Sequence, residues 1–337
     1  MGFKLAGLEP VFALDNDSDA AATFLANMPK VYYDSTEIGQ FSVKALKSSF
    51  RMARGHPRLF CGCAPCQPFT KQRTEPKDND ARRYLLGKFA ELVGRFEPEL
   101  VFVENVPGMQ NVQGKGGPFD AFLRTLDVHK YHVAHSIVRS QDYGVPQMRR
   151  RLVLIASRFG PINFPPKTHG PNTQNPHYSC VRDWIPDLPR IEAGQADAKD
   201  PCHRAASLSE TNLKRIRALK EGEDRRAWTD DLKLACHSKG HKGHTDVYGR
   251  MSWTKQASCL TTRCISLSNG RFGHPEQDRA ISVREAALLQ TFPSGYQFKG
   301  GPTSMARQIG NAVPVVLAQR FGEHFIAHVL AHVEEGL

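Results

Sequence analysis

The chain has 337 residues, of which 40% are hydrophobic and 23% charged, as in a soluble protein with one large domain or two modest ones. No apolar run approaches the length of a membrane span, which argues against an integral membrane protein. The formal net charge of +11 favours a polyanionic partner, because cationic side chains displace the counterions condensed on nucleic acid.

The first half of the chain alternates short apolar segments with amphipathic ones, which is the pattern of a doubly wound α/β sheet. Ser18 is the predicted N-cap of the first main helix. The segment 100–103 is continuously apolar, as in a strand buried on both faces. We expect strands at 10–14, 58–60, 100–103, 131–138 and 152–156, and helices at 18–28 and 82–96.

Composition changes after residue 158, where proline, glycine, histidine and charged residues replace the regular alternation. Regular periodicity returns with expected helices at 282–292 and 312–332. We therefore predict an α/β domain at 1–158, a smaller loop-rich domain at 159–280, and a C-terminal segment at 281–337 that returns to the first domain.

The eight cysteines predict free thiols in a reducing compartment, and we expect no leader peptide before them. Two groups resemble metal ligands: positions 61, 63 and 66, and Cys236 with histidines at 237, 241 and 244. The first group lacks a second pair at zinc-finger spacing. The second is the better candidate, but four ligands at its spacings would need an unusually tight turn. We predict no metal site and interpret 236–244 as a solvated loop.

Two residues at expected strand ends suit covalent catalysis. Cys66 lies between two prolines in the loop after strand 58–60, and Glu104 ends strand 100–103. Each is ordinary by itself, since a lone cysteine is more often a buried hydrophobe and a glutamate at a strand end is usually solvated. Together, a thiol and a carboxyl group at neighbouring strand mouths favour nucleophilic attack assisted by proton transfer.

A basic motif follows at Gln147-Met148-Arg149-Arg150-Arg151. If this segment is extended, alternation places Gln147, Arg149 and Arg151 on one face. Two guanidinium groups on one face suit a base carbonyl, a carboxylate or a phosphate. A solvated basic strand end is the ordinary alternative.

Five motifs in this order resemble those of the DNA cytosine-5 methyltransferases. They are Pro65-Cys66-Gln67, Glu104-Asn105-Val106, Gln147-x-Arg149-x-Arg151, Arg284-Glu285 with Gln290-Thr291-Phe292-Pro293, and Gly310-Asn311-Ala312-Val313-Pro314. The resemblance implies a Rossmann-like, doubly wound sheet of the S-adenosylmethionine-dependent type with a loop-rich target-recognition domain. In this family the 1–158 domain would be catalytic and 159–280 would read the DNA.

The implied reaction moves a methyl group from S-adenosyl-L-methionine to C5 of a flipped cytosine in double-stranded DNA, through a covalent adduct with Cys66. Glu104 would hold or protonate N3 of the base. Arg151 would contact the cytosine O2, and Arg149 would support Glu104 and the base pocket. The resemblance further implies a cytoplasmic, nucleoid-associated protein, no membrane partner, and a cognate restriction endonuclease.

The resemblance also implies a donor pocket. Asp15 would accept hydrogen bonds from the ribose hydroxyls at a strand end. An aromatic residue often occupies the position of Asn16, so adenine stacking would be weaker here. The implied donor residues are Asp15, Asn16, Glu37, Ile38, Pro65, Leu85, Asn311 and Ala312.

We expect the 159–280 domain to determine which DNA sequence is recognised. The segment 237–263 alternates basic residues with glycine and threonine, as loops that read a groove do. Ser258-Cys259-Leu260-Thr261-Thr262 resembles the Thr-Leu element of family recognition domains.

One family feature is missing from this sequence: an opening strand followed by a Phe-x-Gly-x-Gly loop. In the family this strand lies between those matching 10–14 and 58–60, so both neighbours would keep an unpaired edge. Three explanations compete: a start that lies upstream, which we prefer; a strand donated by a second polypeptide; and a decayed, inactive DNA-binding homologue. A tRNA cytosine-5 methyltransferase is a further alternative, which the long recognition region disfavours.

Overall fold

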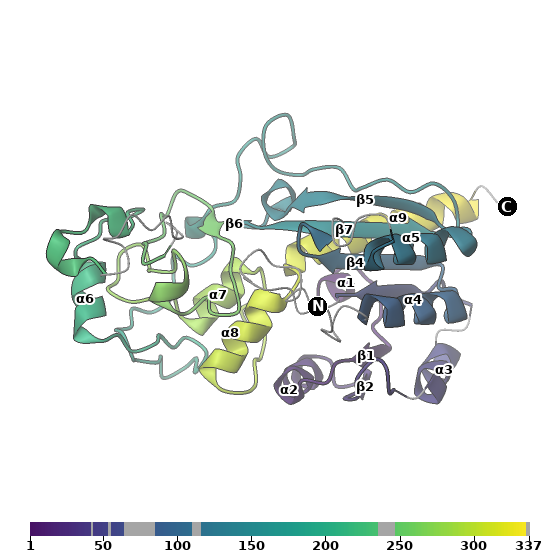
Figure 1. Ribbon diagram of the computed structural model, residues 1–337, viewed down its shortest axis with the longest axis horizontal. Coiled ribbons are helices and arrows are strands. Elements are labelled where there is room, and N and C mark those ends of the chain that lie inside the picture. The colour runs from purple at the N-terminus through teal and green to yellow at the C-terminus, as the bar shows by residue number, and fades with distance from the viewer. Residues whose placement is uncertain (42, 53–54, 64–84, 110–115, 235–246, 335–337) are drawn as a thin grey trace. The chain divides into compact units, whose positions relative to one another are not determined.

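The computed structural model describes residues 1–41, 43–52, 55–63, 85–109, 116–234 and 247–334 (Figure 1). The chain divides into two compact units. The first unit consists of 1–139, 150–166 and 318–337, and the second of 140–149 and 167–317. Compared with the predicted domain limits, residues 159–166 lie in the first unit and 281–317 lie in the second.

The first unit holds most of the regular structure. Its elements are α1 (Gly2–Leu5), β1 (Phe12–Leu14), α2 (Ser18–Asn27), β2 (Tyr32–Asp34), α3 (Val43–Met52), β3 (Leu59–Gly62), α4 (Leu85–Phe96), β4 (Leu100–Asn105), α5 (Pro118–Val128), β5 (His132–Arg139) and β7 (Arg150–Ser157). The last helix, α9 (Val315–Glu334), begins in the second unit and continues into the first.

The main sheet of the first unit has the strand order β3-β4-β7-β5. β3 and β4 are parallel, and β7 runs antiparallel to both β4 and β5. All six residues of β4 are buried, which confirms the prediction of a strand covered on both faces. The α/β fold expected from the sequence is therefore present.

Helices cover both faces of this sheet, and the side chains of β4 alternate between the two faces. Val101 and Val103 belong to a core cluster with residues of α4 and α5, two helices that lie side by side in Figure 1. Phe102 points the other way, where its ring meets Phe3 of α1 at 5.2 Å and Phe321 of α9 at 5.4 Å. One strand thus joins two hydrophobic layers.

The sheet is interrupted where the sequence predicts a missing strand. β1 and β2 form a separate parallel pair. Among the described residues, the sole strand partner of β3 is β4, and the exposed Cys61 lies on β3. β1 and β3 therefore each end a sheet, as expected for the two neighbours of an absent strand.

Several helix ends differ from the predictions. The N-cap of α2 is Asp17 rather than Ser18, because its carboxylate accepts hydrogen bonds from the backbone N–H of Asp19 and Ala20, both at 3.0 Å. The predicted helix 82–96 is described from Leu85 onward. Helix α8 was not predicted, and Pro302 occupies its first position.

The second unit is mostly irregular, as predicted for its loop-rich sequence. Its elements are η4 (Ser140–Tyr143), β6 (Gln147–Met148), η5 (Val181–Asp183), α6 (Glu210–Arg217), η6 (Arg225–Ala227), η7 (Asp230–Leu232), β8 (Ala257–Ser258), η9 (Leu267–Asn269), α7 (Val283–Leu289) and α8 (Pro302–Asn311). Among the described residues, no helix of either unit is both long and apolar enough to cross a membrane.

Buried arginines connect the irregular segments of this unit. Arg250 donates to the carbonyls of Ile216, Leu219, His274 and Gln277 at 2.6–3.0 Å and also to Asp278. Arg279 forms a two-point pair with the buried Glu285, both contacts at 2.7 Å. Loops leave backbone carbonyls without ladder partners, and these guanidinium groups satisfy them.

Gly310 of α8 is packed against backbone, and a Cβ added there would lie 2.2 Å from the carbonyl carbon and oxygen of Thr261. We predict that Gly310→Ala lowers the free energy of unfolding by about 1–3 kcal/mol, as overpacking does. Gly87 of α4 has open space around its Cβ position. Gly87→Ala should therefore stabilise the protein, by up to about 1 kcal/mol. Urea unfolding measures both, and equal effects would contradict this packing.

Candidate active site

Glu104 is held at the carboxyl end of β4 by an arginine of the neighbouring strand. Its side chain is 7% exposed, and its Oε1 lies 3.1 Å from Nε of Arg151. The antiparallel register explains this contact, because Asn105 pairs with Leu152 and Arg151 therefore lies one step beyond the end of β4. The cation beside this carboxylate offsets part of the cost of burying its charge.

The guanidinium of Arg151 has capacity beyond this ion pair. Besides the contact with Glu104, it donates to the carbonyl of Arg150 at 2.8 Å. The contact with Glu104 is an ion pair, and among the described residues the hydrogen bond to Arg150 uses one of the five N–H donors of an arginine. The pair can therefore offer a carboxyl oxygen and N–H donors to one ligand, which matches the edge of a nucleobase.

β3, the strand that precedes the predicted cysteine loop, ends at the same edge of the sheet. It is parallel to β4, and its last residue, Gly62, pairs with Val103, the residue before Glu104. Pro65 and the predicted nucleophile Cys66 lie outside the described residues.

Predicted donor residues gather at the carboxyl ends of β1 and β2. Asp15 and Asn16 follow β1, Glu37 follows β2, and all three are exposed. Nδ2 of Asn16 lies 3.5 Å from Oε1 of Glu37, and Oδ1 of Asp15 accepts from the backbone N–H of Asp17 at 2.9 Å. The parallel pairing of the two strands brings these groups to one edge.

Two further predicted donor residues are apolar side chains of the first unit. Ile38 packs against the core cluster that contains Leu86 of α4. Leu85 is half-buried at the first position of that helix. An apolar side chain next to the polar group of Asp15, Asn16 and Glu37 would suit a flat heterocycle attached to a sugar.

Tyr33 of β2 belongs to this edge, although the sequence analysis did not single it out. Burial raises the pKa of its hydroxyl, and the charges of Asp15 and Asp17 raise it further. The hydroxyl therefore stays protonated beside these carboxylates. The segment 32–34, Tyr-Tyr-Asp, is too short for a pattern in the sequence to identify a strand.

Arg149 belongs to the second unit. It is 1% exposed and donates to the carbonyls of Leu260, Gly310 and Ala312 at 3.1–3.2 Å. Within the first unit, the guanidinium next to Glu104 is that of Arg151, and support of Glu104 by Arg149 stays a prediction. Arg149 lies between the end of β6 and the start of β7, so the alternation of a single strand does not apply to it.

Asn311 and Ala312 lie in the second unit. Asn311 is the last residue of α8 and is exposed, and α9 starts at Val315. The carbonyl of Ala312 accepts from Nη2 of Arg149 at 3.2 Å and from Nε2 of Gln290 at 2.5 Å.

Both residues of the Arg284-Glu285 motif are in ion pairs. Arg284 pairs with Asp200 at 2.5 Å, and Glu285 pairs with Arg279 at 2.7 Å, all within the second unit. In the described part of the chain, no three or more His, Cys, Asp or Glu side chains are grouped to hold a metal ion. Residues 236–244 lie outside that part.

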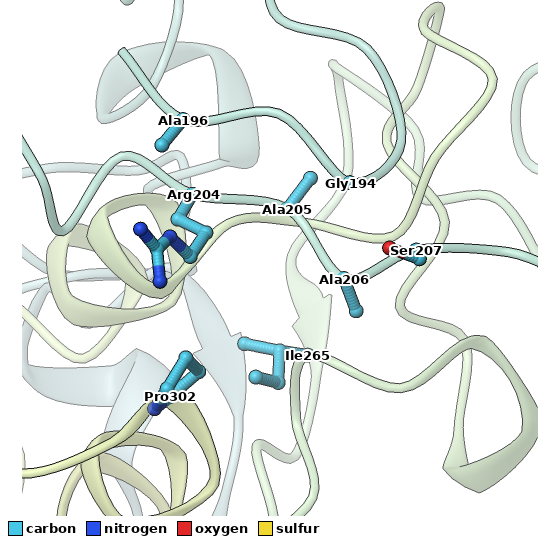
Figure 2. A pocket seen from close by; sticks show the side chains of 8 residues that line it. All are labelled: Gly194, Ala196, Arg204, Ala205, Ala206, Ser207, Ile265 and Pro302. Carbon is cyan, nitrogen blue, oxygen red and sulfur yellow. The ribbon is translucent and has the colours of Figure 1, made fainter. Parts of the chain in front are cut away.

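The second unit also contains a hollow of about 450 Å³ (Figure 2). None of the residues predicted for catalysis or donor binding lines it. The exposed guanidinium of Arg204 is its one charged side chain. Its lining residues are Gly194, Ala196, Arg204, Ala205, Ala206, Ser207, Ile265 and Pro302.

A family model described as C-5 cytosine-specific DNA methylase matches residues 1–327. The chain belongs to this family. Its relatives include the Type II methylase M.HgiDII of Herpetosiphon aurantiacus, 38% identical over 323 residues that cover 94% of this chain and 89% of the relative. The Type II methyltransferase M.DdeI of Desulfomicrobium norvegicum is 28% identical and covers 96% of this chain and 84% of its own.

Solved structures show the same fold for this C-5 cytosine methylase. An E. coli prophage DNA modification methyltransferase superposes with a TM-score of 0.72 at 20% identity, covering 97% of this chain and 94% of the other. A DNMT2 mutant of Spodoptera frugiperda gives 0.63 at 18% identity, covering 96% and 95%.

We predict that Glu104 and Arg151 stabilise each other. Arg151→Met leaves a buried carboxylate without its cation and should cost about 3–5 kcal/mol of unfolding free energy. Adding Glu104→Gln to that variant should recover part of the loss, with an interaction energy of about 0.5–3 kcal/mol in a double-mutant cycle followed by urea unfolding.

The exposed pair Lys88–Glu91, 2.9 Å apart, is the control for this cycle. Its coupling, measured with Lys88→Met and Glu91→Gln, should stay below about 1 kcal/mol. Additive effects of the Glu104 and Arg151 variants would show that the pair is not coupled.

Proposed function

We propose that this chain methylates C5 of a flipped cytosine in duplex DNA, with S-adenosyl-L-methionine as methyl donor, as a modification enzyme of the Type II kind named for its relatives. The observation that carries the proposal is the Glu104–Arg151 pair, which lies at the edge of the sheet where β3 ends. Family membership supplies the reaction, and this pair supplies groups that fit the base.

The proposed chemistry begins with attack of the Cys66 thiolate on C6 of the cytosine, which forms a C–S bond and makes C5 nucleophilic. Glu104 holds N3 and supplies its proton, so negative charge does not build up on the ring. Arg151 donates to O2. C5 would then take the methyl group from the sulfonium of the donor, whose methyl–sulfur bond breaks to leave a neutral thioether. Loss of the C5 proton to a base, cleavage of the C6–S bond and return of the N3 proton to Glu104 release the product and the Cys66 thiolate.

The residues of the first unit fit the nucleoside end of the donor. The carboxylates of Asp15 and Glu37 can accept from ribose hydroxyls, and Ile38 offers an apolar surface. Pro65 and Leu85, and in the second unit Asn311 and Ala312, stay predicted donor residues. The donor would supply an electrophilic methyl group on a sulfonium.

DNA binding follows from charge and from the second unit. The net charge of +11 favours a polyanion, and flipping a base costs a few kcal/mol that phosphate contacts offset. Arg204 in the hollow of Figure 2 suits a phosphate group. We propose that 159–280 reads the sequence, and that a cognate restriction endonuclease is the biological partner.

The covalent step gives the most direct test of this function. A duplex with 5-fluorocytosine at the target cannot lose a proton from C5, so the adduct should accumulate when the donor is present. We expect a protein–DNA adduct in denaturing gels, with the attachment mapped to Cys66 by peptide mass spectrometry.

Cys66→Ser should abolish the adduct. Cys63→Ser is the matched control, since it removes an exposed thiol three positions earlier, and it should still form the adduct. An adduct that persists in Cys66→Ser would rule out this nucleophile.

A further inference from the structure

Three fully buried polar side chains in the second unit form one hydrogen-bonded group, which we call the clasp: Gln147, Arg149 and Gln290. Their exposed fractions are 0%, 1% and 0%. Buried polar groups of this size are costly unless they are satisfied, so their partners indicate what the group maintains.

Gln147 connects β6 to two distant segments. Its Oε1 accepts from the backbone N–H of Leu260 at 3.0 Å. Its Nε2 donates to the carbonyl of Leu289 at 3.2 Å and to the side-chain carbonyl of Gln290. Gln290 in turn donates to the carbonyl of Ala312 at 2.5 Å.

Arg149 spans the same segments with one guanidinium. Nη1 donates to the carbonyls of Leu260 and Gly310, and Nη2 donates to that of Ala312. The backbone of Gly310 lies directly against Thr261, where no Cβ fits. The segments 259–262 and 310–312 are therefore fixed to each other through the clasp and through backbone contact.

We infer that Arg149 is a positioning residue that holds the Leu260–Thr261 segment and the Asn311–Ala312 turn as one rigid piece, so that DNA and donor are bound by parts that cannot shift independently. This inference rests on the proposed function, because it takes 258–262 as part of DNA recognition and Asn311–Ala312 as part of donor binding. It gives Arg149 no contact with either ligand.

Arg149→Lys tests the inference because lysine keeps the charge but cannot reach three carbonyls with a planar fork. We expect the KM for the donor and the KM for DNA to rise together, each about tenfold, as expected for one lost charge-assisted hydrogen bond. The kcat should change less than either KM, since the reacting groups are untouched.

Arg250→Lys is the matched control. Arg250 is 4% exposed, lies in the same unit and also donates to backbone carbonyls. None of these carbonyls belongs to the segments 259–262 and 310–312 that Arg149 joins. It should lower the unfolding temperature without changing either KM. If Arg149→Lys behaves like Arg250→Lys, Arg149 is structural only, and the inference is wrong.

A second variant covers the case in which Arg149→Lys does not fold. Gln147→Met removes the link of Gln147 to Leu260 and Gln290 without changing charge, and it should also raise both KM values. A rise in one KM alone would refute the coupling. If the unmodified protein and Arg250→Lys both fail to methylate any DNA, the proposed function fails instead of the clasp.

Discussion

The buried ion pair between Glu104 and Arg151 is the interaction on which the candidate active site depends. A carboxylate at the end of a fully buried strand is stable only with a cation beside it, and the register of β7 against β4 supplies that cation. The same pairing fixes both groups on rigid strands instead of loops. The site can therefore present an acid and a donor to a base without ordering them at each binding event.

Much of the first unit could be predicted because its signals are local. The apolar run 100–103 indicated a strand buried on both faces, and β4 is such a strand. The absence of a glycine-rich opening motif predicted the break between β1 and β3. Prediction failed where two neighbouring residues could each cap the same helix, as Asp17 and Ser18 could at the start of α2. It also failed at α8, whose sequence from Pro302 to Asn311 carries few apolar residues.

The arrangement of the site residues was harder to predict than the strands, and the reason is physical. Period-two alternation placed Arg149 and Arg151 on one face, but it holds only within a single strand. The break between β6 and β7 falls at Arg149, which separates the two arginines into different units and different tasks. Its carbonyl partners at Leu260, Gly310 and Ala312 are more than a hundred residues away, and no local pattern could indicate them.

The measurement that tests the central claim most directly is product analysis with a donor whose methyl group carries a heavy isotope. Duplex DNA incubated with the protein would be digested to nucleosides and separated by mass spectrometry. We expect labelled 5-methylcytosine from the unmodified protein and none from Glu104→Ala. Label on a cytosine nitrogen, on adenine or in RNA alone, or no label in any nucleoside, would contradict it.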